Sequence, residues 1–475
     1  MNKLRWAMDG GVWDVDVSTP ATVDGVARPV SGVTLPLGLS RGARLSRPKQ
    51  ADFFQRFMAM PFIPSLSGAG LSFQRALSLP LPDNWFSAFL GQFNVHKFVT
   101  SLKRNEVRQE TLGSSLKSIW GHLSDPNLYA VNFLLEWLLT PEDRVQLGFE
   151  TQGYGKNPRR KAVFHHKARV ILFSQIYINV TFFQFPNHDL VVEASSPALF
   201  VDRFGKYWDV PFTLSVDVSS LASDSSTSCH FCINHTMGSP KQCEGEPVNT
   251  PVPRGLFPGL CGKCAYSYKK DFDLWRSEAP KTKMVLPYDI FLSTPHISAS
   301  ALLGTVITAS LGDNSTRAHE EDESFGLQAR GAYSALSADL FASASLSAQH
   351  GNFQKPFLDL TRFYARLDIP SGSKFLAGAS QVASDLCSSR VPSLEAFQAV
   401  CPSASLSFQQ QIAGPFSFRM DAGVTVDLKK ECYVNVNDPV FAVEYALQVL
   451  ASAKAIAWYS PRHREFMLEL RFFET

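Results

Sequence analysis

Apolar and polar residues alternate strictly along several long stretches of this chain. From Arg464 to the end, one side of the alternation is apolar, with Phe466, Leu468, Leu470 and Phe472, and the other side carries Met467, Glu469, Arg471 and Phe473. Successive side chains of a β-strand point to opposite faces, so this segment predicts a strand with one apolar and one polar face. The stretches 210–218, 406–412 and 416–426 repeat the pattern. The chain is therefore expected to be all-β.

Turn residues between alternating stretches predict antiparallel hairpins. Gly and Pro at 413–415 separate two such stretches, His-Gly-Asn at 350–352 separates two more, and 140–143 separates a third pair. Short polar segments that contain Gly, Pro or Asp are typical of hairpin turns. The last expected hairpin joins one long strand, 441–459, to the terminal strand.

Two architectures fit long alternating strands. Many of the stretches reach the ~9 residues that a tilted strand needs to cross a hydrocarbon layer, against ~5–6 for an average soluble strand. A membrane barrel would put the apolar side toward lipid and the polar side toward a lumen. A large soluble sheet would put them toward a core and toward water. The polar sides carry these charged residues: Asp217, Arg362, Arg366, Asp368, Arg419, Asp421, Glu444, Glu469 and Arg471.

A few segments have the pattern of short helices or loops. Residues 47–60 open with a proline at the second position and predict an amphipathic helix. The segment 112–123 fits a helix or a loop, and 392–402 fits a helix with Ser393 as its N-cap. We expect long loops near 225–285 and near 312–332.

Composition restricts the possible environments and partners. Hydrophobic residues make up 45% of the 475 residues and charged residues 19%, below the roughly 25% typical of soluble proteins. The net charge of +2 is too small for bulk attraction to nucleic acid. No stretch supplies the ~20 apolar residues of a membrane helix. Acidic residues among the first sixteen argue against a cleavable transit peptide.

Three motifs suggest chemistry, and their context argues against it. The segment 38–42, "GLSRG", matches a hydrolase nucleophile elbow around Ser40, but that motif requires a strand before it and a helix after it. Two Cys-x-x-Cys pairs, at 229–232 and 261–264, resemble zinc ligands. The first lies in a predicted strand, where residues three apart point to opposite faces. We therefore expect no enzyme activity, no metal and no cofactor.

A basic stretch next to aromatic residues is the strongest candidate for binding. Four basic residues without an acid between them precede three phenylalanines: Arg41, Arg44, Arg47 and Lys49, then Phe53, Phe54 and Phe57. Such a pattern suits a phosphate together with an acyl chain. An ordinary solvated basic loop is the alternative.

Several longer segments resemble the trigalactosyldiacylglycerol 4 family of plants. They include "LPLGLSRGARLSRPKQ", "SPALFVDRFGKYWDVP", "GNFQKPFLDLTRFYARLD" and "FMLELRFFET", and the resemblance covers nearly the whole chain. It implies a β-barrel of the chloroplast outer envelope that takes part in lipid transfer from the endoplasmic reticulum for galactolipid synthesis. It also implies phosphatidic acid binding, homodimerisation, membrane contact sites and an inner-envelope lipid-transport complex as partner. Residues 167–188 have no counterpart in the family pattern.

Together these observations predict one antiparallel transmembrane β-barrel of roughly 12–16 strands. It would span 71–475, with 167–188 either an insertion or a gene-model artefact. Residues 1–70 would form a basic, amphipathic segment that plugs or flanks the barrel. The terminal strand would turn its apolar side to the bilayer and Glu469 and Arg471 to the interior.

The expected function is non-enzymatic passage of a glycerolipid, with phosphatidic acid as the best candidate. Arginine suits a phosphate because its planar fork binds two oxygens. The candidate phosphate ligands are Arg41, Arg44, Arg47 and Lys49, then the lumen-side residues Arg362 and Arg366. Pairing of the last two with Asp359 or Asp368 is the alternative. A solute channel and a soluble hydrolase built around Ser40 are the rival functions.

Overall fold

One large antiparallel sheet contains most of the described strands in the computed structural model. The structure describes residues 21–22, 48–49, 52, 55, 63–67, 70–79, 81–106, 115–153, 158–169, 187–201, 207–220, 227–242, 252, 256–274, 296–311, 327–331, 334–351, 359–369, 371–389, 393–413, 416–427, 433–446, 453–461 and 464–472. The sheet is predicted correctly as antiparallel throughout its described pairings.

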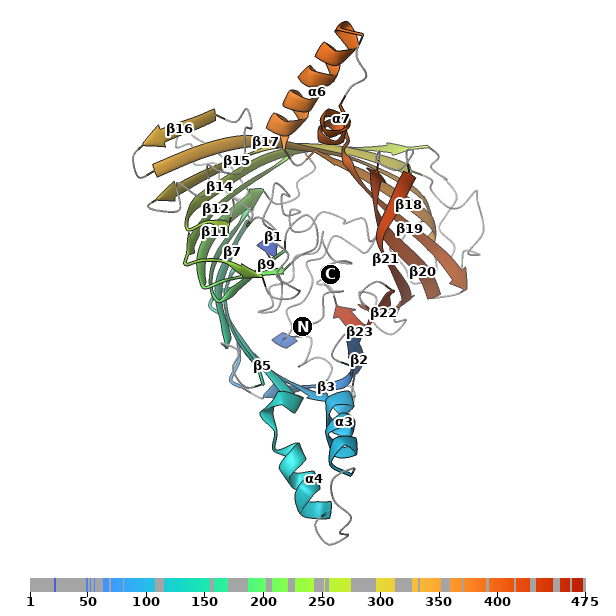
Figure 1. Cartoon of the computed structure of the whole chain (residues 1–475). Helices are drawn as coiled ribbons and strands as arrows, with labels where there is room; N and C mark the ends of the chain where they lie inside the picture. The colour runs from blue at the N-terminus through green and yellow to red at the C-terminus, as the bar shows by residue number, and fades with distance from the viewer. Residues whose placement is uncertain are drawn as a thin grey trace.

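Eighteen of the described strands form a closed ring, in which each strand pairs with the next. They are β2 (Ile63–Ser67), β3 (Gly70–Leu79), β4 (Trp85–Asn94), β5 (Tyr129–Leu138), β6 (Asp143–Gln152), β7 (Arg159–Arg169), β8 (Asn187–Ser196), β11 (Phe212–Ser220), β12 (Thr227–Met237), β14 (Gly259–Asp273), β15 (His296–Leu311), β17 (Ser334–Gly351), β18 (Asp359–Ile369), β19 (Ser403–Ala413), β20 (Phe416–Asp427), β21 (Tyr433–Ala446), β22 (Ala453–Ser460) and β23 (Glu465–Phe472). β2 pairs with β3 on one side and with β23 on the other, which closes the ring (Figure 1).

The expected count of roughly 12–16 strands was therefore too low. The expected loop at 225–285 contains β12 and β14, and the one at 312–332 contains β16 (Leu327–Gly331), which pairs only with β17. The predicted strand 441–459 is divided between β21 and β22. These strands carry Cys, Gly, Lys or runs of Ser and Ala, so their hydrophobic alternation is weak. The ring begins at Ile63 rather than at 71.

The insertion predicted at 167–188 lies mostly outside the described residues. β7 continues to Arg169 and β8 begins at Asn187, and these two strands pair directly with each other. The ends of the predicted insertion therefore belong to the wall of the ring.

The two faces of the wall have opposite character, and the buried face is the polar one. In β5, Leu134 and Glu136 are buried, whereas Tyr129 and Trp137 are exposed on the other face. Paired residues of neighbouring strands share a face, so the register extends this division around the ring. The exposed face includes these large side chains: Leu71, Leu77, Leu147, Leu214, Tyr266, Leu303, Leu346, Phe363, Leu406 and Tyr459.

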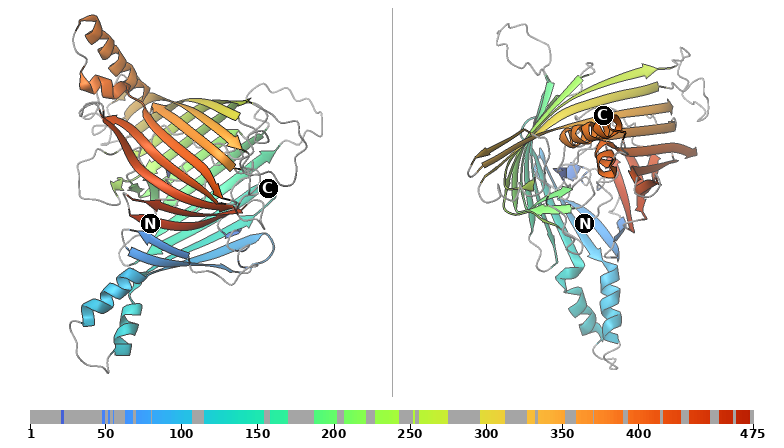
Figure 2. Two further views of the ribbon diagram at one scale, coloured as in Figure 1. Left: turned by 90° about the vertical axis from the view of Figure 1, so that its right-hand side faces the viewer. Right: turned by 45° about the horizontal axis from the view of Figure 1, so that its top comes forward.

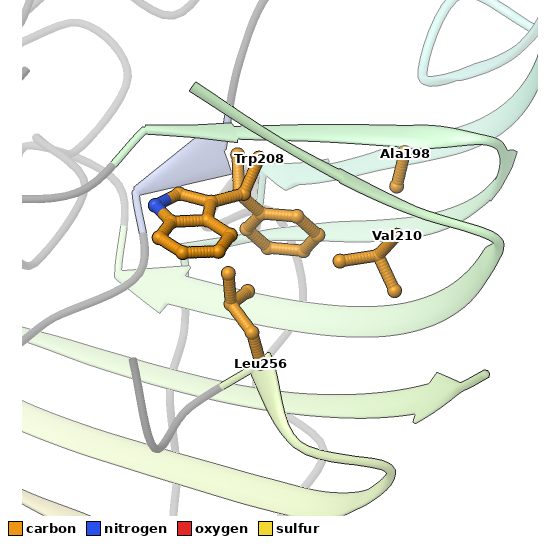
Figure 3. Packing of buried hydrophobic residues seen from close by; sticks show 5 residues of the cluster. Ala198, Trp208, Val210 and Leu256 are labelled. Atoms are coloured by element: carbon orange, nitrogen blue, oxygen red, sulfur yellow. The ribbon is translucent and has the colours of Figure 1, made fainter. Parts of the chain in front are cut away.

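A second, small sheet lies within the ring in the view of Figure 1. It consists of β1 (Ala21–Thr22), β9 (Ala198–Val201), β10 (Tyr207–Val210) and β13 (Lys241–Gln242). Trp208, Val210 and Leu256 pack together there with almost no exposed surface (Figure 3). This apolar cluster occupies the rim at which β8 ends and β11 begins.

Two helical hairpins project from that same rim. α3 (Val95–Glu106), α4 (Ser115–Leu123) and a short 3-10 turn, η2 (Pro126–Leu128), connect β4 to β5, whereas α6 (Gly372–Cys387) and α7 (Leu394–Val400) connect β18 to β19. β4 and β18 run in the same direction in the antiparallel ring, so both connections leave one end, as Figure 2 shows. The Ser393 hydroxyl accepts a hydrogen bond from the Ala396 amide, which confirms the predicted N-cap of α7. None of the described helices is long and apolar enough to cross a membrane.

Gly378 allows α6 and α7 to pack closely. A Cβ atom at this position would lie 2.7 Å from Ala399 Cβ and 2.8 Å from the Ala396 carbonyl oxygen. We expect Gly378→Leu to separate the two helices at a cost of about 1–3 kcal/mol, the usual range for overpacking. Limited proteolysis between α6 and α7 should then become faster. Gly121→Ala is the matched control, because a Cβ there meets nothing within 4 Å. Equal proteolysis of both variants would contradict this account of the packing.

Candidate functional site

The inner face of β18 to β21 holds a buried network of charged and polar side chains. Arg362 pairs with Gln409, and Gln409 with Arg419, so the three side chains form one row across three strands. Arg419 contacts Asp421 at 2.9 Å and Glu444 at 3.8 Å. The Gln409 amide donates to Ser417 at 3.1 Å and to Glu444 at 3.3 Å. Low exposure strengthens these electrostatic contacts, because little water screens them.

A second polar cluster lines the inner face of β7 to β12. Lys161 forms an ion pair with Glu193 at 3.0 Å, and both side chains are less than a tenth exposed. The Ser195 hydroxyl lies 3.3 Å from Glu193 and 3.2 Å from the hydroxyl of Thr213. Two histidine–aspartate pairs lie on the same wall: His165 with Asp189, and His230 with Asp217. The interior therefore presents paired charges of both signs.

The N-terminal segment touches the inner wall on β3, β4 and β5. Lys49 Nζ lies 3.4 Å from Oε1 of the fully buried Glu136 and 5.6 Å from the centre of the Phe86 ring. The Ser78 amide donates to Gln55 at 2.7 Å, and its hydroxyl donates to Asp52 at 3.3 Å. Since helical positions recur among the described residues of 48–55, part of the predicted helix is present on this wall.

Among the described residues, the predicted phosphate ligands do not lie together. Lys49 lies at β5 and Arg362 on β18, nine strands apart in the ring of eighteen. Arg366 donates to Asp368 at 2.7 Å, the pairing that the sequence offered as the alternative. Arg41, Arg44 and Arg47 lie outside the described residues, as does Ser40.

Sequence reasoning noticed Arg419 and Glu444 only as charges on polar faces. Their proximity to each other and to Gln409 follows from the register of β19 against β20 and of β20 against β21, which the alternation of residues does not specify. The register of β18 against β19 and of β20 against β21 was the missing information.

The four cysteines of the paired motifs lie on both faces of the wall. Cys232 and Cys261 are buried on the inner face, opposite Lys263 and Asn234, whereas Cys264 is exposed on the outer face. A zinc ion cannot bridge the two faces of one sheet. Among the described residues, no group of three or more potential metal ligands is present.

No family model matches the chain. The chain is 48% identical to the protein named TRIGALACTOSYLDIACYLGLYCEROL 4, chloroplastic, of Arabidopsis thaliana, over the full length of both. The chain belongs to this family. The resemblance found from its sequence segments is thereby confirmed.

The buried network predicts that Arg419 contributes more to stability than Arg366. Arg419→Met leaves Asp421 and Glu444 on the buried wall without their cation, and breaking such a buried pair costs about 3–5 kcal/mol. Arg366→Met removes an ion pair in which both side chains are about a quarter or more exposed, so it should cost about 0–1 kcal/mol. Denaturant unfolding followed by tryptophan fluorescence measures both. Similar costs for the two variants would show that the network does not stabilise the wall.

Proposed function

We propose that the ring crosses the outer envelope membrane of the plastid and passes glycerophospholipid, with phosphatidic acid as the preferred cargo. The carrying observation is the reversal of the two faces: large apolar side chains are exposed on the outside, and charged ones are buried inside. Water on the outer face would leave this apolar surface unsatisfied, whereas a hydrocarbon layer matches it.

Aromatic residues near both rims support a membrane position. Trp85 and Trp137 stack at 4.8 Å near the end of the ring opposite the helical hairpins. Phe93 and Tyr129 pack at 5.5 Å at the other end, where the hairpins begin. Aromatic belts at both water interfaces are typical of membrane proteins, including barrels.

Lipid rather than a small solute is the proposed cargo for two reasons. The name of the relative includes the name of a galactolipid, trigalactosyldiacylglycerol, and the word chloroplastic. The two chains match over their whole length. The small inner sheet and the Lys49 contact also occupy part of the interior, which argues against a wide open channel. Transfer from the endoplasmic reticulum toward galactolipid synthesis is the proposed direction.

The phosphate ligands of this proposal are Arg41, Arg44, Arg47 and Lys49, with Arg362 and Arg366 as a second group on the wall. Residues 1–62, which precede β2, would act as a plug that also binds headgroups, and the contacts of Lys49, Asp52 and Gln55 support a position inside the ring. The proposed partners are a second copy of the chain and an inner-envelope lipid-transport complex, at contact sites with the endoplasmic reticulum.

Membrane position is tested by an arginine in the middle of the outer face. Leu303 lies near the middle of β15 and is 59% exposed, and Leu376 on α6 is 62% exposed. Arginine facing the bilayer midplane costs about 2–4 kcal/mol and near the interface about 0–1 kcal/mol. We expect Leu303→Arg to lower the free energy of unfolding from lipid vesicles more than Leu376→Arg does, as measured by denaturant unfolding. If Leu303→Arg costs no more than Leu376→Arg, the outer face does not contact hydrocarbon.

Headgroup recognition is tested by removing the basic charges. We expect Arg41→Gln, Arg44→Gln and Arg47→Gln combined to weaken binding to vesicles that contain phosphatidic acid at least tenfold, since each arginine can donate two hydrogen bonds to a phosphate. Vesicle flotation measures the binding, with phosphatidylcholine vesicles as the reference. The control variant, Lys103→Gln, Lys241→Gln and Lys374→Gln, removes the same charge from exposed positions. Unchanged binding of the arginine variant, with the ring intact, would refute the assignment.

A further inference from the structure

The pairing of β2 with β23, which closes the ring, is its weakest strand pairing among those described. β2 has five residues, and it shares two register pairs with β23, Ser65 with Met467 and Leu66 with Phe466. On its other edge, β23 shares eight register pairs with β22. Among the described pairings of the ring, the contact between β2 and β23 is the smallest. We refer to it as the seam.

A proline reduces the hydrogen-bonding capacity of the closing strand β2 itself. Pro64 is the second residue of β2 and lies opposite Phe73 of β3. Proline has no backbone N–H, so this position cannot donate to a neighbouring strand, and proline is usual only at strand edges. The strand that closes the ring thus has both a short length and a missing donor.

An arginine lies on the outer face of β3, the strand on the other side of β2 from the seam. Arg75 is the sixth of the ten residues of β3, and it is exposed on the same face as Leu71, Leu77 and Leu79. Its register partner on β4 is Gly91. A Cβ atom added at Gly91 would meet one aromatic carbon at 3.8 Å and nothing closer. The register partner of Arg75 therefore has no side chain of its own on the outer face.

The position of Arg75 differs from that of other basic residues on the outer face. Arg160 is the second residue of β7, and Lys270 is the fourth residue from the end of β14. In the part of the wall that the structure describes, Arg75 differs from these two residues because it lies near the middle of its strand. It is an exposed charged side chain among apolar ones on the outer face. A charge at membrane depth is costly and commonly marks an ion or substrate pathway.

We propose that the seam between β2 and β23 is a lateral passage for lipid, and that Arg75 binds the headgroup phosphate at its outer side. This inference rests on the proposed function, and it adds the route and a phosphate ligand. Separation of β2 from β23 would break two register pairs, whereas any other described opening breaks more. The guanidinium fork would bind two phosphate oxygens while the acyl chains lie against the neighbouring leucines.

A reversible covalent lock tests the passage. Ser65→Cys with Met467→Cys places two thiols at a register pair of the seam, and oxidation with diamide would join them. The protein is reconstituted in vesicles, and transfer of fluorescent phosphatidic acid to acceptor vesicles is measured before oxidation, after it, and after reduction with dithiothreitol. We expect transfer to fall at least tenfold on oxidation and to recover on reduction.

The matched control locks the other edge of the same strand. Ala457→Cys with Leu468→Cys joins β22 to β23, where pairing is long, and oxidation should leave transfer unchanged. Equal transfer by the open and the locked seam would overturn the lateral passage while leaving lipid transfer intact. Absence of transfer by the reduced protein would instead overturn the proposed function and the passage with it.

The role of Arg75 is tested by cargo selectivity. Arg75→Gln should lower the transfer of phosphatidic acid at least fivefold relative to diacylglycerol, which has the same acyl chains and no phosphate. Arg160→Gln removes an outward arginine at the end of a strand and should leave this ratio unchanged. An unchanged ratio in Arg75→Gln would overturn the assignment of Arg75, even if the lock blocks transfer.

Discussion

Closure of the backbone hydrogen-bonding network is the constraint on which the rest of this structure depends. In a sheet that returns to its first strand, every strand has two neighbouring strands, so no strand is left as an open edge of the sheet. The pairing of β2 with both β3 and β23 provides this closure. Once the backbone is satisfied within the wall, the side chains on its two faces can suit two different surroundings. An apolar exterior and a polar interior are the result.

The polar interior imposes its own condition, because a buried charge without a partner is unstable. The described ion pairs show how the wall meets it. Lys161 pairs with Glu193, and Arg419 pairs with Asp421 and Glu444, so charges of opposite sign lie together in each cluster. Replacement of such pairs by apolar residues often costs little stability elsewhere, which makes buried ion pairs weak evidence for stability alone. Their presence around the ring is better explained by an interior that must accommodate polar groups.

The sequence predicted the faces of the strands well and their arrangement poorly. Alternation identified the strands around Phe418, Leu406 and Leu214, because apolar and polar residues follow one another in turn along each of them. It failed for β14, where Gly262, Lys263 and Cys264 interrupt the pattern. Register and ring order depend on contacts between distant segments, so the separation of Lys49 from Arg362 could not be predicted. Arg75 gained significance only after the structure assigned its face.

The weak seam and the N-terminal segment occupy the same side of the ring. Ser78 on β3, Phe86 on β4 and Glu136 on β5 receive the contacts of the segment, and β3 is the direct neighbour of β2. A five-residue strand with a proline gives the ring few hydrogen bonds at that point, so contacts on the strands beside it contribute more to holding the wall together than they would elsewhere. The Lys49–Glu136 pair is well suited to this, because one partner is fully buried and the other is tethered, through the chain, to the first strand of the ring. The residues from Lys49 to the end of β3 thus contribute to the inner wall, to the closure of the ring and to the outer surface around Arg75.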